Sequence, residues 1–333
     1  MIAAAWRQQR LVAFVALGVV IVFGIWLAVT GTMQENAWAA FRAAGNGPCV
    51  VFAGSSCAGA AAHYNVLNHL STVSAGTLYA LPVLLGLILG APLIAREIEQ
   101  RTNRMAWTQS ITRTRWLLLK LSVGATTVVV LVGGLAPLVE WWTSATHRDV
   151  RIVPTTFDIV GVAPVAYALF AFALGTALGA IIRRSAWAFA AGVPIYAGVR
   201  LVIRQYVRPG LLSPSATAST SGNSMASAWV TNAGYVPLGR LSPAAGQSWQ
   251  SGEEAIANCT TTLTHAATSS AQFEAIASHA WATCTSRAHV HLVTQFQPSS
   301  HFWPLQVLEL AIFLGAALAL FVTAGLAVQW WRT

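Results

Sequence analysis

The feature that most constrains this chain is a set of six long segments that carry almost no charge. A helix that spans a membrane needs about 20 mainly apolar residues. The segments run over residues 11–30, 73–95, 116–141, 159–182, 186–203 and 305–329. Of the 333 residues, 56% are hydrophobic and only 9% are charged, whereas soluble proteins carry about 25% charged residues. The sequence therefore predicts an all-α integral membrane protein with six transmembrane helices.

Basic residues beside the segments set the expected orientation, because cytoplasmic loops carry an excess of Lys and Arg. With both termini inside, the inner connections hold Arg7, Arg10, Arg96, Arg101, Arg104, Arg113, Arg115, Lys120, Arg183, Arg184 and Arg332. The net charge of +9 includes no run of Lys and Arg that would follow a nucleic acid. We expect a multi-pass protein of the cell membrane, surrounded by lipid, with cytoplasmic N- and C-termini and no nucleic-acid partner.

The spans and their connections divide the chain into a small number of expected parts. These are a cytoplasmic interfacial segment at 1–10, helices one to five over 11–203 with an outer loop at 31–72 and a cytoplasmic loop at 96–115, an extracytoplasmic cap at 204–302, and the sixth helix with a short cytoplasmic tail at 303–333. Within the cap, residues 209–243 are rich in Gly, Ser, Thr and Pro, which favours irregular backbone. Residues 253–265 and 271–285 have helix-forming composition, so the cap is expected to be partly helical.

All four cysteines fall in the two expected outer connections. They are Cys49 and Cys57 in the first and Cys259 and Cys284 in the second. Disulfides persist outside the reducing cytosol, so this placement agrees with the orientation. The simplest pairing joins Cys49 to Cys57 and Cys259 to Cys284, although four cysteines allow three connectivities and four free thiols are the alternative. No CxxC motif occurs, and we expect no metal site.

The sequence carries no recognisable motif for covalent chemistry. Its one lysine, Lys120, is not preceded by the glycines of a nucleotide-binding P-loop, and GxSxG and HExxH are absent. We expect no catalytic residue and no cofactor in this chain. Two GxxxG motifs, Gly86–Gly90 and Gly175–Gly179, fit close packing of membrane helices.

Arg200 and Glu309 are charged residues that lie inside the expected spans. Glu309 is about five residues into the sixth segment, or roughly 7 Å deep at about 1.5 Å per residue, and Arg200 is near the outer end of the fifth. Charges in a span usually face the interior of the bundle and have a partner. We expect that the two pair or that each lines the outer part of a substrate route. The alternative is that Arg200 reaches the lipid headgroups and Glu309 caps its own helix.

Charges gather in the expected cytoplasmic loop at 96–115, between two almost uncharged spans. An acidic turn opens the loop, and Met105 and Trp107 form an apolar tip, which is typical of a segment that docks on a soluble partner. The alternative is a solvated loop whose charges reflect only the excess of basic residues on the cytoplasmic side of the membrane. The candidate docking residues are Glu97, Glu99, Arg101, Thr102, Arg104, Met105, Trp107, Gln109, Arg113 and Arg115.

These motifs resemble ABC-2 type ABC transporter permeases, most of all those of actinobacterial type. The resemblance rests on Glu97-x-Glu99-x-Arg101-Thr102, Trp107-Thr108-Gln109-Ser110, Thr112-Arg113-x-Arg115-Trp116 with Lys120, Trp6-Arg7-Gln8-Gln9-Arg10, and Phe302-Trp303-Pro304-Leu305-Gln306 with Glu309. Gln100-Arg101 stands where many relatives have Arg-Gly. The cap at 212–295 has no counterpart in the resemblance.

The resemblance implies one half of an exporter. Two permease chains, a homodimer rather than a heterodimer, would pair in the membrane and bind two copies of a separate ABC ATPase that holds ATP and Mg. The loop at 96–115 would contain the coupling helix, and a drug, lipid, peptide or glycan would move outward. One other possibility is a membrane sensor or assembly protein whose cap binds a ligand without transport. Another is a membrane enzyme, which the absence of a catalytic constellation disfavours.

Overall fold

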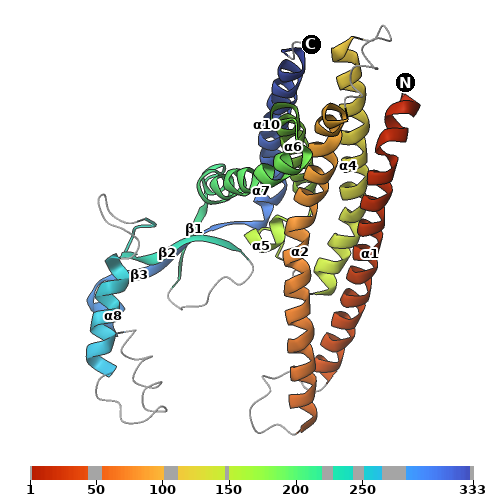
Figure 1. Ribbon diagram of the computed structural model, residues 1–333. Helices are drawn as coiled ribbons and strands as arrows, with labels where there is room; N and C mark the ends of the chain where they lie inside the picture. Colours follow the sequence, from red (N-terminus) through yellow and green to blue (C-terminus); the bar gives the residue numbers. More distant parts are fainter. Residues whose placement is uncertain are drawn as a thin grey trace. The chain divides into compact units, whose positions relative to one another are not determined.

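The protein is described by a computed structural model that covers residues 2–43, 55–100, 112–146, 150–219, 228–242, 251–264 and 283–330. The chain divides into two compact units. The first unit comprises Met1–Arg208 and Trp303–Thr333, and the second comprises Pro209–Phe302. Figure 1 shows long helices in the first unit and a small sheet in the second.

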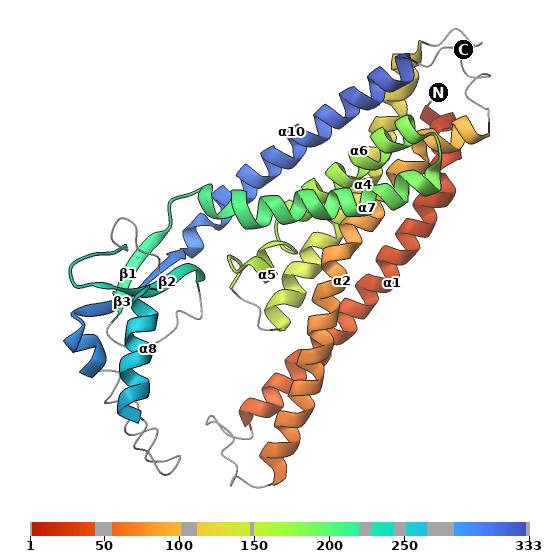
Figure 2. The ribbon, with the colours of Figure 1, turned by 60° about the vertical axis from the view of Figure 1, so that its left-hand side comes forward.

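Six helices in the described part of the chain are long and apolar enough to cross a membrane, which confirms the predicted helical membrane fold. They are α1 (Ile2–Ala43), α2 (Ser55–Glu99), α4 (Arg113–Ala145), α6 (Ala163–Ile182), α7 (Ser185–Val202) and α10 (Phe302–Gln329). Helix α1 packs against α2 and α4, and both views show the three side by side (Figure 1 and Figure 2). The start of α1 and the end of α10 lie at the same end of this unit.

Helices α1 and α2 are longer than the hydropathy of the chain predicts. The segment 31–72 was expected to be an outer loop, but α1 continues to Ala43 and α2 begins at Ser55. The extensions pack together, since the rings of Trp38 and Tyr64 lie 5.3 Å apart between centroids. The expectation of a loop is therefore wrong for 31–43 and 55–72. The length of an apolar segment indicates how much of a helix lies in lipid, but it does not indicate where the backbone hydrogen bonding of that helix ends.

Helix α6 lies at the centre of the first unit, and α2 packs closely on it through the two GxxxG motifs. A Cβ added to Gly86 or Gly90 would overlap a backbone carbonyl of α6. A Cβ added to Gly175 or Gly179 would overlap the α2 backbone at Ala91. Small residues at this spacing let two helix backbones approach each other in a membrane. The two motifs therefore face each other and form one seam between α2 and α6.

Aromatic side chains fill the other side of α6. The ring of Phe313 from α10 lies 5.0 Å from the Tyr167 ring and 5.4 Å from the Phe170 ring, in edge-to-face geometry. The Tyr196 ring from α7 lies 5.8 Å from that of Phe170. Edge-to-face aromatic pairs stabilise a core beyond the area they bury. Helices α7 and α10 are thus packed onto the face of α6 that Phe170 occupies.

The part of the irregular connection between α4 and α6 that runs over 156–160 is buried. The connection contains the short helix α5 (Pro154–Phe157) and continues through Asp158, Ile159 and Val160, all of which are buried. Irregular backbone at membrane depth is tolerated only where protein surrounds it or a cavity lies beside it. Helix α7 also ends irregularly, in a π-helical turn (Ile203–Val207) and a 3₁₀ turn (Arg208–Gly210).

The second unit holds a three-stranded antiparallel sheet in the order β1-β3-β2. Its strands are β1 (Ser215–Ser219), β2 (Trp229–Pro237) and β3 (Val290–Gln297). The expectation of irregular backbone over 209–243 is therefore wrong at 215–219 and 229–237. Trp, Val, Thr and Tyr in β2 favour a strand, and β3 supplies hydrogen-bond partners to both neighbouring strands.

A disulfide joins two parts of the second unit. Cys259 lies on α8 (Ser251–Thr264), which matches the helix expected at 253–265, and it is bonded to Cys284 across a Cα–Cα distance of 5.9 Å. This confirms one of the two expected pairings. Cys49 and the side chain of Cys57 lie outside the described residues, as does most of the helix expected at 271–285, of which 283–287 is helical.

The seam between α2 and α6 can be tested with two glycines on one helix. We expect Gly86→Ala to destabilise the protein by about 1–3 kcal/mol, because its methyl group has no space against the α6 backbone. Gly76→Ala is the matched control, since its Cβ meets nothing within 4 Å, and it should keep or slightly raise stability. Thermal unfolding of both purified variants in detergent measures the difference. Equal melting temperatures would contradict close packing at Gly86.

Candidate functional site

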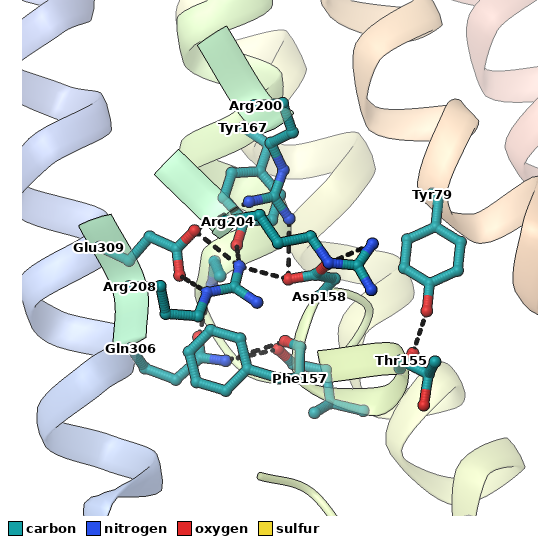
Figure 3. Close-up of polar contacts among 12 residues, drawn as sticks. Tyr79, Thr155, Phe157, Asp158, Tyr167, Arg200, Arg204, Arg208, Gln306 and Glu309 are labelled. Atoms are coloured by element: carbon teal, nitrogen blue, oxygen red, sulfur yellow. Dashed lines mark hydrogen bonds and ion pairs between the residues drawn. The ribbon is translucent and has the colours of Figure 1, made fainter. Parts of the chain in front are cut away.

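The candidate site is a network of charged side chains centred on Glu309 of α10. This carboxylate is completely buried. Its Oε1 accepts a hydrogen bond from Arg200 Nη1 at 2.8 Å and another from Arg208 Nη2 at 2.8 Å. Its Oε2 accepts from Arg208 Nε at 3.0 Å (Figure 3). Glu309 therefore joins α10 to two turns of the helix that begins with α7.

Asp158, just after α5, is the second carboxylate of the network and is also buried. Its Oδ1 lies 2.8 Å from Arg200 Nη2 and also accepts from Arg208. Its Oδ2 lies 3.8 Å from Arg204 Nη1, which is an ion pair but too long for a hydrogen bond. Two carboxylates thus face three guanidinium groups, and the network carries one excess positive charge.

The end of α7 brings the three arginines to one side. Arg200, Arg204 and Arg208 are four residues apart, but in a regular α-helix this spacing drifts around the axis by about 40° at each step because a turn has 3.6 residues. The π-helical turn at Ile203–Val207 widens the helix at this point, and the backbone N–H of Arg208 bonds to the Ile203 carbonyl. A wider turn offsets the drift, and such turns are frequent at functional sites.

Gln306 holds the buried backbone around Asp158 in place. Its Oε1 accepts hydrogen bonds from the backbone N–H groups of Val162 and Ala163, at 3.2 and 2.8 Å. Its Nε2 donates to the carbonyls of Phe157 and Val160, at 3.1 and 3.2 Å. One amide from α10 therefore satisfies four backbone groups of this segment.

Gly161 allows this close approach. Its φ of +74° is a conformation that residues with a Cβ rarely adopt. A Cβ at this position would also lie 3.0 Å from the Gln306 side chain. Glycine is required here both by the backbone conformation and by the space that Gln306 fills.

Aromatic rings complete the surroundings of the arginines. The guanidinium carbon of Arg200 lies 3.6 Å from the centre of the Tyr167 ring, and that of Arg208 lies 4.6 Å from the centre of the Phe157 ring. Cation–π contacts of this kind strengthen when the cation is removed from water. Beside the network, the Tyr79 hydroxyl of α2 donates to the Thr155 carbonyl (Figure 3). Helices α2 and α6 therefore also contribute side chains to the surroundings of the network, Tyr79 and Tyr167 respectively.

The pairing of Arg200 with Glu309 expected from sequence is present as one contact of this larger network. Sequence reasoning missed Asp158, Arg204 and Arg208, because the first was read as the edge of a span and the others as the start of the cap. The spacing of four residues between the arginines was the available signal. A buried ion pair often fails to stabilise a fold relative to apolar residues, so the network is better explained as positioning α5, α7 and α10.

A second set of charged contacts lies at the opposite end of the helical unit, where α2 ends. Glu97 pairs with Lys120 of α4, and both side chains are largely buried. Glu99 accepts hydrogen bonds from the backbone N–H and the hydroxyl of Ser185, at 2.8 and 3.2 Å. A carboxylate is favoured at a helix N-terminus, which here is the start of α7. The last turn of α2 is therefore tied to both α4 and α7.

The structure places only part of the predicted docking loop. Arg101, Thr102, Arg104, Met105, Trp107 and Gln109 lie outside the described residues, as does the side chain of Arg113. Arg115 is exposed, and its backbone N–H donates to Thr112 Oγ1 at 3.4 Å, which places Thr112 as the N-cap of α4. Within the described ranges, no group of three or more His, Cys, Asp or Glu residues could hold a metal ion.

We expect Glu309→Gln to destabilise the protein strongly, because it leaves Arg200 and Arg208 without one of their two carboxylates. Breaking a buried ion pair in this way costs about 3–5 kcal/mol. Thermal unfolding and the yield of monodisperse protein in detergent measure the effect. Glu140→Gln is the control, since Glu140 pairs with Arg151 where both are substantially exposed, and a surface pair contributes about 0–1 kcal/mol. Equal losses in the two variants would contradict the role of the network.

Comparison with known protein families gives one match. The family model of ABC-2 membrane transporter related proteins matches residues 17–208, which is more than half of the 333 residues and includes Asp158 and the three arginines. Comparison with curated protein sequences and with solved structures gives no significant match. The chain is a multi-pass membrane protein of the permease type, and it belongs to the ABC-2 membrane transporter related family.

Proposed function

We propose that this chain is the membrane-spanning permease of an ABC exporter, in which two copies work with two copies of a separate ATPase subunit that binds ATP and Mg. Family membership, six apolar helices and a sequence without a nucleotide-binding P-loop support this assignment. The observation that carries the proposal furthest is the junction of α2 with α4 and α7. The candidate docking residues lie in the segment that leaves this junction.

The junction explains how a soluble partner could move the helices. The connection from α2 to α4 follows directly after Glu99, and the Glu99 side chain binds the start of α7. The connection leads into α4, where Lys120 pairs with Glu97 of α2. A displacement of this connection would therefore act on three helices at once. Because α2 is also packed tightly on α6 along the glycine seam, motion of α2 would carry α6 with it. Movement of rigid helices about an interface is a common form of switching in proteins.

The direction of transport follows from the expected orientation. The Cys259–Cys284 disulfide in the second unit supports an extracytoplasmic position for that unit, since disulfides are rare in the cytosol. The start of α1 and the end of α10 lie together at the end of the helical unit where α2 ends, in agreement with two cytoplasmic termini (Figure 1 and Figure 2). An exporter with this orientation would release a drug, lipid, peptide or glycan on the extracytoplasmic side of the membrane.

ATP hydrolysis tests this proposal and separates it from a sensor that binds a ligand without transport. The complex of this chain with an ATP-binding cassette subunit would be reconstituted in lipid vesicles. We expect ATPase activity that depends on the chain. A chain that neither binds such a subunit nor changes its ATPase rate would favour the sensor and overturn the proposal.

The double variant Glu97→Gln/Lys120→Gln tests the junction in the same complex. Removing both charges avoids an unpaired buried ion, so we expect a chain that folds and binds the ATPase while transport per ATP falls severalfold. Trp107→Asp should instead weaken ATPase binding, because it places a charge in the expected apolar tip. Arg151→Gln, at an exposed surface pair away from this junction, is the control. Normal ATPase binding together with unchanged transport in both test variants would contradict coupling through this segment.

Peptide mass mapping of unreduced protein from whole cells tests the orientation. We expect a bridged peptide containing Cys259 and Cys284 and its loss on reduction. The bridge closes a loop with a sequence separation of 25, so Cys259→Ala should lower the stability of the second unit by about 3 kcal/mol on a chain-entropy estimate. Free thiols at both positions in functional protein would argue against an extracytoplasmic second unit.

A further inference from the structure

A cavity of about 430 Å³ lies between α2 and α7, within the helical unit. Most of its lining is apolar, from Ala80, Val83, Leu84, Val193, Ala197 and Leu201. Its other lining residues include Asp158, Arg200 and Arg204 of the charge network and the ring of Tyr167. Cavities that bind small molecules have volumes of about 300–1,000 Å³ and combine an apolar lining with a few convergent polar groups. The size and the lining of this cavity suit a ligand with one apolar and one charged part.

The apolar side of the cavity is accessible from the surface of the helical unit. Leu201 is 63% exposed and Leu84 is 41% exposed, and both lie within helices long enough to span the membrane. Side chains of this kind on a spanning helix face lipid. A molecule dissolved in the bilayer could therefore reach the cavity without crossing water.

The charged end of the cavity has an excess of cations and of hydrogen-bond donors. Three arginines face two carboxylates, and the charge that remains is concentrated at Arg204. Its side chain is 40% exposed, and within the described residues its one polar contact is the 3.8 Å ion pair with Asp158. Deeper in the network, Nη1 of the buried Arg208 has no hydrogen-bond partner among the residues that the structure describes. An uncompensated cation at membrane depth is unfavourable, and an anion next to Arg204 would balance it.

We propose that this cavity binds a lipid-like amphiphile with one anionic headgroup. The guanidinium of Arg204 holds the headgroup through two N–H donors, the geometry in which Arg binds phosphate or carboxylate groups. The acyl chain lies between α2 and α7 along Ala197 and Leu201. The site is complete within one chain and requires no ATPase, so the proposal does not depend on the transport function.

Lipid binding to the purified full-length chain in detergent tests the site. Phosphatidylglycerol is the probe, phosphatidylcholine tests the need for net negative charge, and inorganic phosphate tests the need for an acyl chain. We expect phosphatidylglycerol to be retained in native mass spectra and to raise the melting temperature by several degrees, and the other two to do neither. Inorganic phosphate that competes with phosphatidylglycerol at equal concentration would show a simple anion site and overturn the proposal.

Two pairs of variants separate the headgroup contact from the chain contact. Arg204→Gln should weaken phosphatidylglycerol binding at least tenfold, whereas Arg184→Gln, an exposed arginine at the other end of α7, should leave it unchanged. Ala197→Trp should block the cavity, whereas Val202→Trp, on the same helix and 53% exposed, should not. If Arg204→Gln fails to fold, the tryptophan pair still decides.

Binding that is unchanged in Arg204→Gln or in Ala197→Trp would overturn the proposal. A second copy of the chain is the competing occupant of this face. Cysteine introduced as Leu201→Cys would form a disulfide between two chains in membranes if such a contact covered the cavity, and that result would also overturn the proposal.

Discussion

Glu309, a carboxylate without exposed surface, is the group on which one end of the helical unit depends. A bilayer offers no water to charged or backbone groups, so each must find its partner within the protein. Arg200 and Arg208 pair with Glu309 and Asp158, and Gln306, one turn before Glu309, satisfies the backbone around Asp158. One turn of α10 therefore holds both the α5 segment and the irregular end of α7. Without this turn of α10, the backbone of the α5 segment and the arginines at the end of α7 would lose these polar partners.

Helix α2 connects the two ends of this unit. At one end, Glu97 and Glu99 hold α4 and α7, and toward the other, Tyr79 contacts the α5 segment. Between them, glycines bring α2 against α6 closely enough that a single methyl group would be excluded. Close packing of this kind transmits displacement rather than absorbing it, because packed interiors have low compressibility. In a family of transporter permeases, such a helix is suited to carry motion from a soluble partner to the membrane-embedded residues.

The limits of prediction are clearest in two regions. The strands β1 and β2 were missed because their edges are rich in Gly, Ser and Pro, and the decisive partner, β3, lies more than 50 residues later in the sequence. Arg204 and Arg208 were missed because apolar length placed the end of the fifth span at residue 203, before the π-helical turn that carries α7 onward. In the first region the pairing of distant segments decided the conformation, and in the second the π-helical turn did.

The sequence by itself determined the membrane class, the six helices and the family, because apolar length and charge-rich motifs are properties of single segments. It offered the Cys259–Cys284 pairing as the simplest of three connectivities, and the structure decided it. The sequence also indicated that Arg200 and Glu309 needed partners, because an isolated charge in lipid is costly. Only the tertiary structure decided which partners these are. Asp158, Arg208 and Glu309 are 50 and 101 residues apart in the chain, and no local pattern relates them. Their contact depends on how α6, α7 and α10 pack, which is set by the aromatic core and the glycine seam on the two sides of α6.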